Sequence, residues 1–133
     1  MKTIQQFMTE NQIYIEFKHM PERPDRFMAD MPQGTRHFKA VVCYRNKPSK
    51  WFSTFYSIGP ALNYPNAYNC FSCLISDAQA GTMDAFEFMA EFGYEDIYEA
   101  RKIHAACVKQ YEKMLAFLGP ELLEEAMYEL EGL

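Results

Sequence analysis

The sequence lacks most of the patterns that mark enzymes and membrane proteins. No apolar run approaches the roughly 20 residues of a membrane-spanning helix, and the N-terminal stretch MKTIQQFMTEN has no apolar signal-peptide core. The six glycines are isolated, so no glycine-rich loop can hold a phosphate, and no Gly-x-Ser-x-Gly nucleophile motif occurs. We therefore expect a cytoplasmic protein that has no membrane anchor, no cofactor and no catalytic residues.

Histidine and cysteine are also scarce, with three and four residues. Cys70 and Cys73 are three positions apart, as are His104 and Cys107, and two crossing helices could present these four side chains to one zinc ion. The alternative is that Cys70 and Cys107 belong to apolar helix faces, since free cysteine is among the most buried residue types. We favour this alternative, and we predict reduced cysteines and no bound metal.

What the chain does contain is enough apolar material for one domain, residues 1–133. Of its 133 residues, 49% are hydrophobic and 16% are aromatic. The sequence predicts an α+β fold, with a short helix and a small three-stranded antiparallel sheet in residues 1–59. Residues 60–133 are predicted to form about four helices, which make a layer against which the sheet packs.

Alternation of apolar and polar residues predicts the strands Ile13–Phe17, Arg36–Arg45 and Trp51–Ile58. Asn46–Lys50 is predicted to be a five-residue turn that joins the last two strands into a hairpin. An isolated hairpin is only marginally stable, so the first strand is expected to complete the sheet. The segment Met20–Thr35, with three prolines and no period, is predicted to be a long loop.

Capping residues and spacing of three and four predict the helices. Thr3 and Gln6 form a capping-box pattern at the first helix. The second helix has an apolar stripe at helical spacing, formed by Ala67, Cys70, Phe71, Leu74, Ile75 and Ala78. Thr82 is expected to cap a third, with Phe86, Met89 and Ala90 on its apolar face. A long helix from about Glu95 follows, and Gly119-Pro120 separates it from the last helix.

Charge is divided between the two parts of the chain. Residues 1–74 carry nine basic and five acidic residues, a net charge of +4. Residues 75–133 carry four basic and thirteen acidic residues, a net charge of −9. Because such a division affects association and not the fold, it suggests two competing sites for a partner.

The first site is the acidic surface of the last helix, which we predict to bind a basic partner through Glu121, Glu124, Glu125 and Glu129. The second is the basic, aromatic hairpin, which could grip single-stranded nucleic acid. Its residues are Arg36, Lys39, Arg45, Lys47, Lys50 and Trp51. Each pattern also has an ordinary explanation. The acids of the last helix can be a solvated helix exterior, and the lysines of the hairpin can protect an edge strand from aggregation.

Several sequence blocks resemble a family of small phage and prophage proteins without an assigned function. They are FMTENQI near the N-terminus, STFYSIGPAL at the end of the hairpin, then CLISDA, DAFEFMAEFGY, CVKQYEKMLAFLG and AMYELEGL. The resemblance implies a phage or prophage origin, a place in the host cytoplasm and no particular chemistry. We therefore hypothesise an accessory protein that binds a host protein or nucleoprotein complex, of the anti-defence or anti-CRISPR type. The alternative is a nucleic-acid-binding module.

Overall fold

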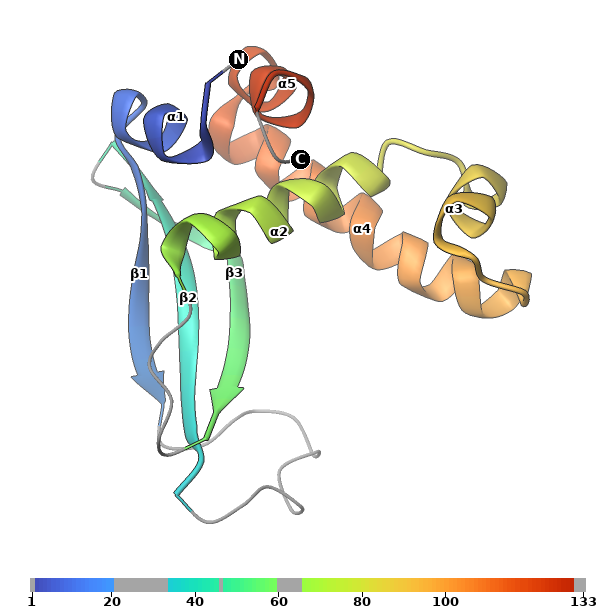
Figure 1. Cartoon of the computed structure of the whole chain (residues 1–133), viewed down its shortest axis with the longest axis horizontal. Coiled ribbons are helices and arrows are strands. Elements are labelled where there is room, and N and C mark those ends of the chain that lie inside the picture. Colours follow the sequence, from blue (N-terminus) through green and yellow to red (C-terminus); the bar gives the residue numbers. More distant parts are fainter. Residues whose placement is uncertain (1, 21–33, 46, 60–65, 131–133) are drawn as a thin grey trace.

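The computed structural model describes residues 2–20, 34–45, 47–59 and 66–130. It confirms the α+β class, with one helix before a small antiparallel sheet and a group of helices after it (Figure 1). The elements are α1 (Ile4–Glu10), β1 (Ile13–Met20), β2 (Arg36–Tyr44), β3 (Lys47–Ile58), α2 (Ala67–Ala80), α3 (Ala85–Phe92), α4 (Ile97–Leu118) and α5 (Pro120–Tyr128). Most of the predicted Met20–Thr35 loop lies outside the described residues.

The strand order is β1-β2-β3, and both pairs are antiparallel. The predicted hairpin is confirmed, but its predicted five-residue turn is wrong, because Lys47 already pairs with Tyr44. Arg45 makes the tight turn by adopting a left-handed backbone with φ of 52°, a conformation usually left to glycine or asparagine. Its N–H donates to the carbonyl of Gln12, which itself has a φ of 56°.

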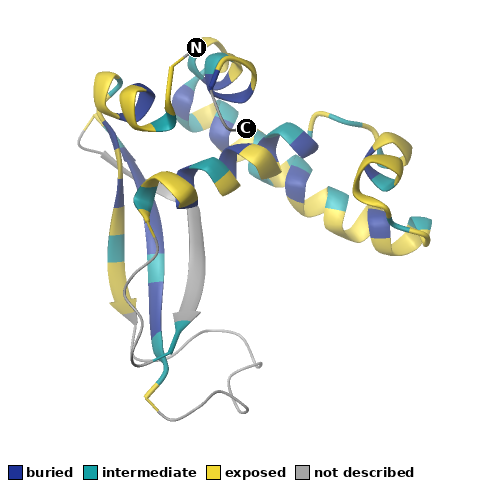
Figure 2. Cartoon of the chain, in the orientation of Figure 1, coloured by how far each residue is buried: buried dark blue, intermediate teal, exposed yellow. Residues whose placement is uncertain are grey.

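The sheet packs against the helices at one end only, so the predicted layered packing holds for part of its length (Figure 1). Figure 2 shows β1 buried at its start and exposed toward its end. Ile13 and Ile15 of β1 and Ala40 and Val42 of β2 lie in the main core. These four residues face the same side of the sheet, because their registers pair Ile15 with Val42.

The main core is completed by α1, α2, the second half of α4 and α5. The stripe predicted for α2 is confirmed, since Cys70, Phe71, Leu74, Ile75 and Ala78 are buried. The capping box predicted for α1 is also present, with reciprocal hydrogen bonds of 3.0 and 3.1 Å between Thr3 and Gln6. Local capping and a continuous apolar stripe together place these helices over the end of the sheet.

A smaller, second core lies where α3 packs on the first half of α4, away from the sheet (Figure 1). We call this part, residues 84–104, the tip. Phe88 is its central side chain. Its ring stacks on Tyr94, with centroids 5.6 Å apart, and lies tilted beside His104, with centroids 5.3 Å apart. The imidazole Nε2 of His104 lies 2.6 Å from the carbonyl oxygen of Met83. His104 is thus a packing residue that joins α4 to the start of the tip.

The expected apolar face of α3 is correct only in part, because Met89 packs against the second core. Phe88 is buried, whereas Phe86 is 62% exposed and Ala90 is exposed. The helix begins two residues later than expected, because Asp84 rather than Thr82 accepts the capping hydrogen bond, from the Glu87 N–H at 2.8 Å.

Candidate partner-binding surface

The predicted acidic site is built on α5, whose start is fixed by two residues. Gly119 has a φ of 87°, which interrupts the chain after α4, and Pro120 occupies the first helical position. Leu123, Ala126 and Met127 turn into the main core. The opposite face of α5 is therefore left to solvent.

Glu121, Glu124 and Glu125 share this exposed face, because their spacing of three and four residues brings them onto one side of the helix. Glu121 and Glu124 are exposed and form no ion pair with any described residue. Glu129 is exposed and caps the C-terminal end of the helix, just beyond the other three. The structure thus gathers three of the four predicted residues on one face and places the fourth at its edge.

One of these acids is neutralised within the chain. The ammonium of Lys2 lies 3.4 Å from Glu125 and 2.7 Å from Glu10, and the hydrogen bond to Glu10 raises the pKa of Lys2. Lys2 also forms a parallel bridge with Leu130, which ties the two ends of the described chain together (Figure 1). The free charge of the α5 face therefore resides mainly on Glu121, Glu124 and Glu129.

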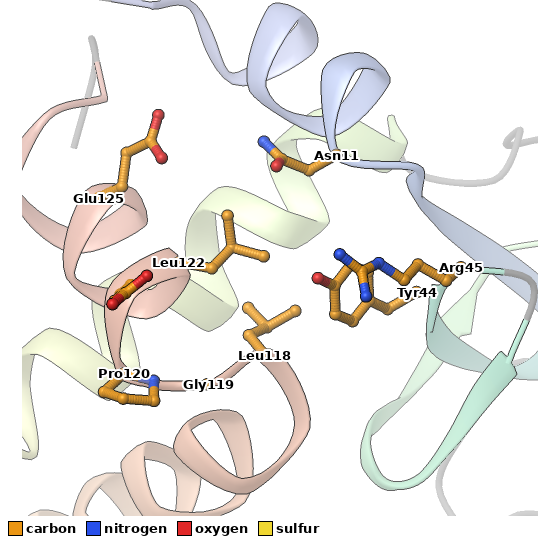
Figure 3. A pocket seen from close by; sticks show the side chains of 9 residues that line it. Asn11, Tyr44, Arg45, Leu118, Gly119, Pro120, Leu122 and Glu125 are labelled. Atoms are coloured by element: carbon orange, nitrogen blue, oxygen red, sulfur yellow. The ribbon is translucent and has the colours of Figure 1, made fainter.

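A cleft of about 480 Å³ brings a member of the basic set next to this acidic face. Figure 3 shows Tyr44 and Arg45 on one side, Glu125 on the other, and Leu118 and Leu122 between them. The guanidinium of Arg45 lies 5.0 Å from the centre of the Tyr44 ring. A phosphate bound to Arg45 would face the carboxylates that line the same cleft, so this site disfavours nucleic acid.

The other basic residues do not gather around Arg45. Arg36 and Arg45 stand at opposite ends of β2, roughly 30 Å apart at the usual rise of an extended strand. Lys39 lies on the sheet face opposite that of Arg36, because strand residues alternate. Lys47, Lys50 and Trp51 lie in β3, and their side chains are outside the described part of the chain. Arg36, Lys39 and Arg45 thus form no continuous basic surface of the kind that nucleic acid requires.

The tip carries a second acidic surface, separate from the one predicted on α5. Six acids and no basic residue occur between residues 82 and 100. Asp84 and Asp96 are helix caps, and the backbone hydrogen bond from Glu87 lowers the pKa of Asp84. Glu91, Glu95 and Glu99 are exposed. The sequence shows the run of acids. The structure is needed to tell which of them cap helices and which do not.

Large aromatic side chains are exposed near both acidic surfaces. Phe86, Phe92 and Tyr98 at the tip are 62%, 53% and 76% exposed, and Tyr128 on α5 is 58% exposed. Tyr128 follows Glu124 by four residues and so lies on the same face of α5. This spacing was the sequence signal available for Tyr128, which the predicted site did not include.

The cysteines and histidines lack the arrangement that a zinc site requires. Among the described residues, no three His, Cys, Asp or Glu side chains are grouped closely enough to hold a metal ion. None of the four cysteines, all of which lie in the described chain, forms a disulfide; Cys70 and Cys107 are buried, whereas Cys73 is exposed. Burial raises the pKa of both Cys107 and Cys43, which favours the thiol over the reactive thiolate. The thiol Sγ of Cys43 lies 3.6 Å from a carboxylate oxygen of Glu16.

Comparisons with known proteins identify no relative: no protein-family model, no curated protein and no solved structure matches this chain. In the described part of the chain, no helix is long and apolar enough to cross a membrane.

Proposed function

We propose that this protein is a non-enzymatic accessory protein of phage or prophage origin that binds a basic surface of a host protein or nucleoprotein complex. It acts in the host cytoplasm and inhibits a defence system, as anti-CRISPR proteins do. The sequence blocks that resemble phage and prophage proteins support the origin. The charge of −9 on residues 75–133 supports a basic partner.

The single observation that carries the proposal is the exposed face of α5. Glu121 and Glu124 present two carboxylates that no described residue pairs with, and exposed Tyr128 lies beside them. Aromatic residues are enriched in protein interfaces, and complementary charge accelerates encounter and selects the partner. The competing nucleic-acid function has weaker support, because the described basic residues of the hairpin are spread along β2.

The test is affinity capture from host lysate with immobilised protein, with and without nuclease. Glu121→Lys with Glu124→Lys reverses the charge of α5, and Glu91→Lys with Glu95→Lys makes the same change in net charge at the tip. We expect a partner that survives nuclease treatment, is lost by the α5 variant and is kept by the tip variant.

Three outcomes would contradict this assignment. Loss of the partner by the tip variant alone would place the interface on α3 and α4. Equal loss by both variants would indicate nonspecific attraction to negative charge. Loss of every partner after nuclease treatment would favour the nucleic-acid alternative.

A further inference from the structure

A groove of about 320 Å³ runs along the side of α5, where that helix meets α4. Tyr111 and Leu115 of α4 form one wall. Glu124 and Tyr128 of α5 stand on the other side, and Leu123 and Met127 are buried along its base. The groove is distinct from the cleft beside Arg45, which lies between α5 and the hairpin turn.

Hydrogen bonds of two lining residues, Met127 and Thr82, help to fix the shape of the groove. The side-chain amide of Gln79 donates to the carbonyl of Met127 at 3.0 Å, which ties the end of α2 to the end of α5. The hydroxyl of Thr82 then donates to the carbonyl of Gln79 at 2.6 Å. Because Leu123 and Met127 also belong to the main core, the base of the groove is part of the folded interior. A partner side chain would therefore meet a largely preformed surface.

The chemistry of the lining specifies what this groove can accept. Among the described residues that line it, Glu124 alone carries a charge, and its carboxylate has no ion-pair partner in the described chain. Tyr111 and Tyr128 contribute aromatic rings, and the base is aliphatic. A bound anion would face Glu124 without a compensating cation. A group with an apolar stem and a cationic end matches all three features.

We propose that this groove receives an arginine side chain of the basic partner. The methylene stem packs on the partly exposed side chains of Tyr111 and Leu115, and the guanidinium lies against the Tyr128 ring and pairs with Glu124. Arginine suits such a site because its planar, weakly hydrated guanidinium stacks on aromatic rings and pairs with carboxylates through two parallel hydrogen bonds. The inference rests on the proposed function, since it names the group by which a basic partner is recognised.

The test uses N-acetyl-arginine methylamide as the probe and the corresponding citrulline compound as its neutral isostere. Titration is followed by two-dimensional NMR of the folded, labelled chain. We expect the arginine probe to shift the amide signals around Glu124 and Tyr128 and to bind about tenfold more tightly than citrulline, because citrulline loses both the ion pair and the cation–π contact.

Two exposed acids provide matched variants. Glu124→Gln should weaken binding of the arginine probe about threefold, the usual range of an exposed ion pair. Glu112→Gln, on α4 outside the groove lining, should leave it unchanged. Equal binding of citrulline, shifts located away from the groove, or equal weakening by Glu112→Gln would each overturn the proposal.

The two hypotheses fail in different ways. If capture from lysate depends on α5 charge but the arginine probe does not bind, the groove assignment alone is wrong. If the probe binds as expected but charge reversal on α5 leaves capture intact, the groove is a cation site and the proposed function is wrong.

Discussion

Phe71 and Phe86 are both helical phenylalanines, but one is buried and the other is exposed. Phe71 is fully buried in the main core, where its ring lies 6.1 Å from that of Phe7. Phe86 is 62% exposed at the tip. Both sit on helices with apolar stripes, so residue type and helical spacing did not separate them. What separates them is how each helix packs, because α2 buries Phe71 in the main core whereas α3 packs on α4 through Phe88.

Replacing each of these phenylalanines by alanine tests that difference. Phe71→Ala should lower the free energy of unfolding by about 3–5 kcal/mol, because it removes a buried ring from a packed core. Phe86→Ala should change it by less than about 0.5 kcal/mol, as expected for an exposed side chain. Urea denaturation of the two variants measures both values. Equal losses would mean that Phe86 is buried by an intermolecular contact or that the tip packs differently.

At the scale of elements, capping and periodicity were sufficient for α1 and α2 but insufficient for the hairpin turn. Asn46–Lys50 contains a proline and polar residues, which normally indicate a loop. Instead β3 begins at Lys47, and Pro48 pairs opposite Cys43 beside a register shift in β2. Proline is tolerated there because β3 is an edge strand, and position in the sheet is not encoded locally.

The candidate site, like the hairpin turn, could be predicted from the sequence only in part. The acids of α5 could be predicted from helical spacing, whereas the groove beside them could not. Tyr111 and Leu115 of α4 are only partly buried. They border a groove because α5 leaves part of α4 uncovered, and that depends on how the chain turns at Gly119.

The packing of α2 against α4 depends on Gly81, the residue that ends α2. A Cβ atom at this position would lie 2.3 Å from the carbonyl oxygen of Cys107, which is closer than real structures allow. Gly93, at the end of α3, has a φ of 72° and open space around it. The two glycines are therefore required for different reasons, the first for close approach and the second for backbone conformation.

Substitution by asparagine distinguishes these two requirements. Gly81→Asn should destabilise the protein by about 1–3 kcal/mol or more, since the backbone of α4 must move away. Gly93→Asn should cost less than about 1 kcal/mol, because asparagine tolerates the left-handed conformation better than other residues do. Thermal unfolding of both variants provides the comparison. A larger loss at Gly93 would show that α2 and α4 do not cross at Gly81.

At the scale of the whole molecule, the basic and the acidic residues are concentrated on different parts of the fold. The sheet extends away from the helices (Figure 1). Exposed acids that include Glu121, Glu124 and Glu91 lie on α5 and on the tip. The molecule therefore has two acidic surfaces separated by the length of α4. On α5 the described residues combine unpaired acids with a groove. A basic partner would be attracted by the whole acidic half and anchored at α5.

If attraction and anchoring are separate steps, the association and dissociation rate constants should depend on different acids of α5. Glu121 and Glu129 lie outside the groove lining, so Glu121→Lys with Glu129→Lys should mainly slow association with the captured partner. At low salt the association rate constant should fall about tenfold or more, and the difference should shrink once the Debye length drops below about 8 Å. Glu124→Gln removes an anchoring contact and should mainly speed dissociation.

Surface plasmon resonance at several salt concentrations measures both rate constants, with Glu91→Lys and Glu95→Lys at the tip as the charge-matched control. If the double reversal on α5 changed only the dissociation rate, independently of salt, Glu121 and Glu129 would be direct contacts and steering would be excluded. If Glu124→Gln changed only the association rate, Glu124 would act as a surface charge and not within the groove. The expected separation follows from geometry, because a charge on an open helix face acts at a distance, whereas a carboxylate beside aromatic rings acts on contact.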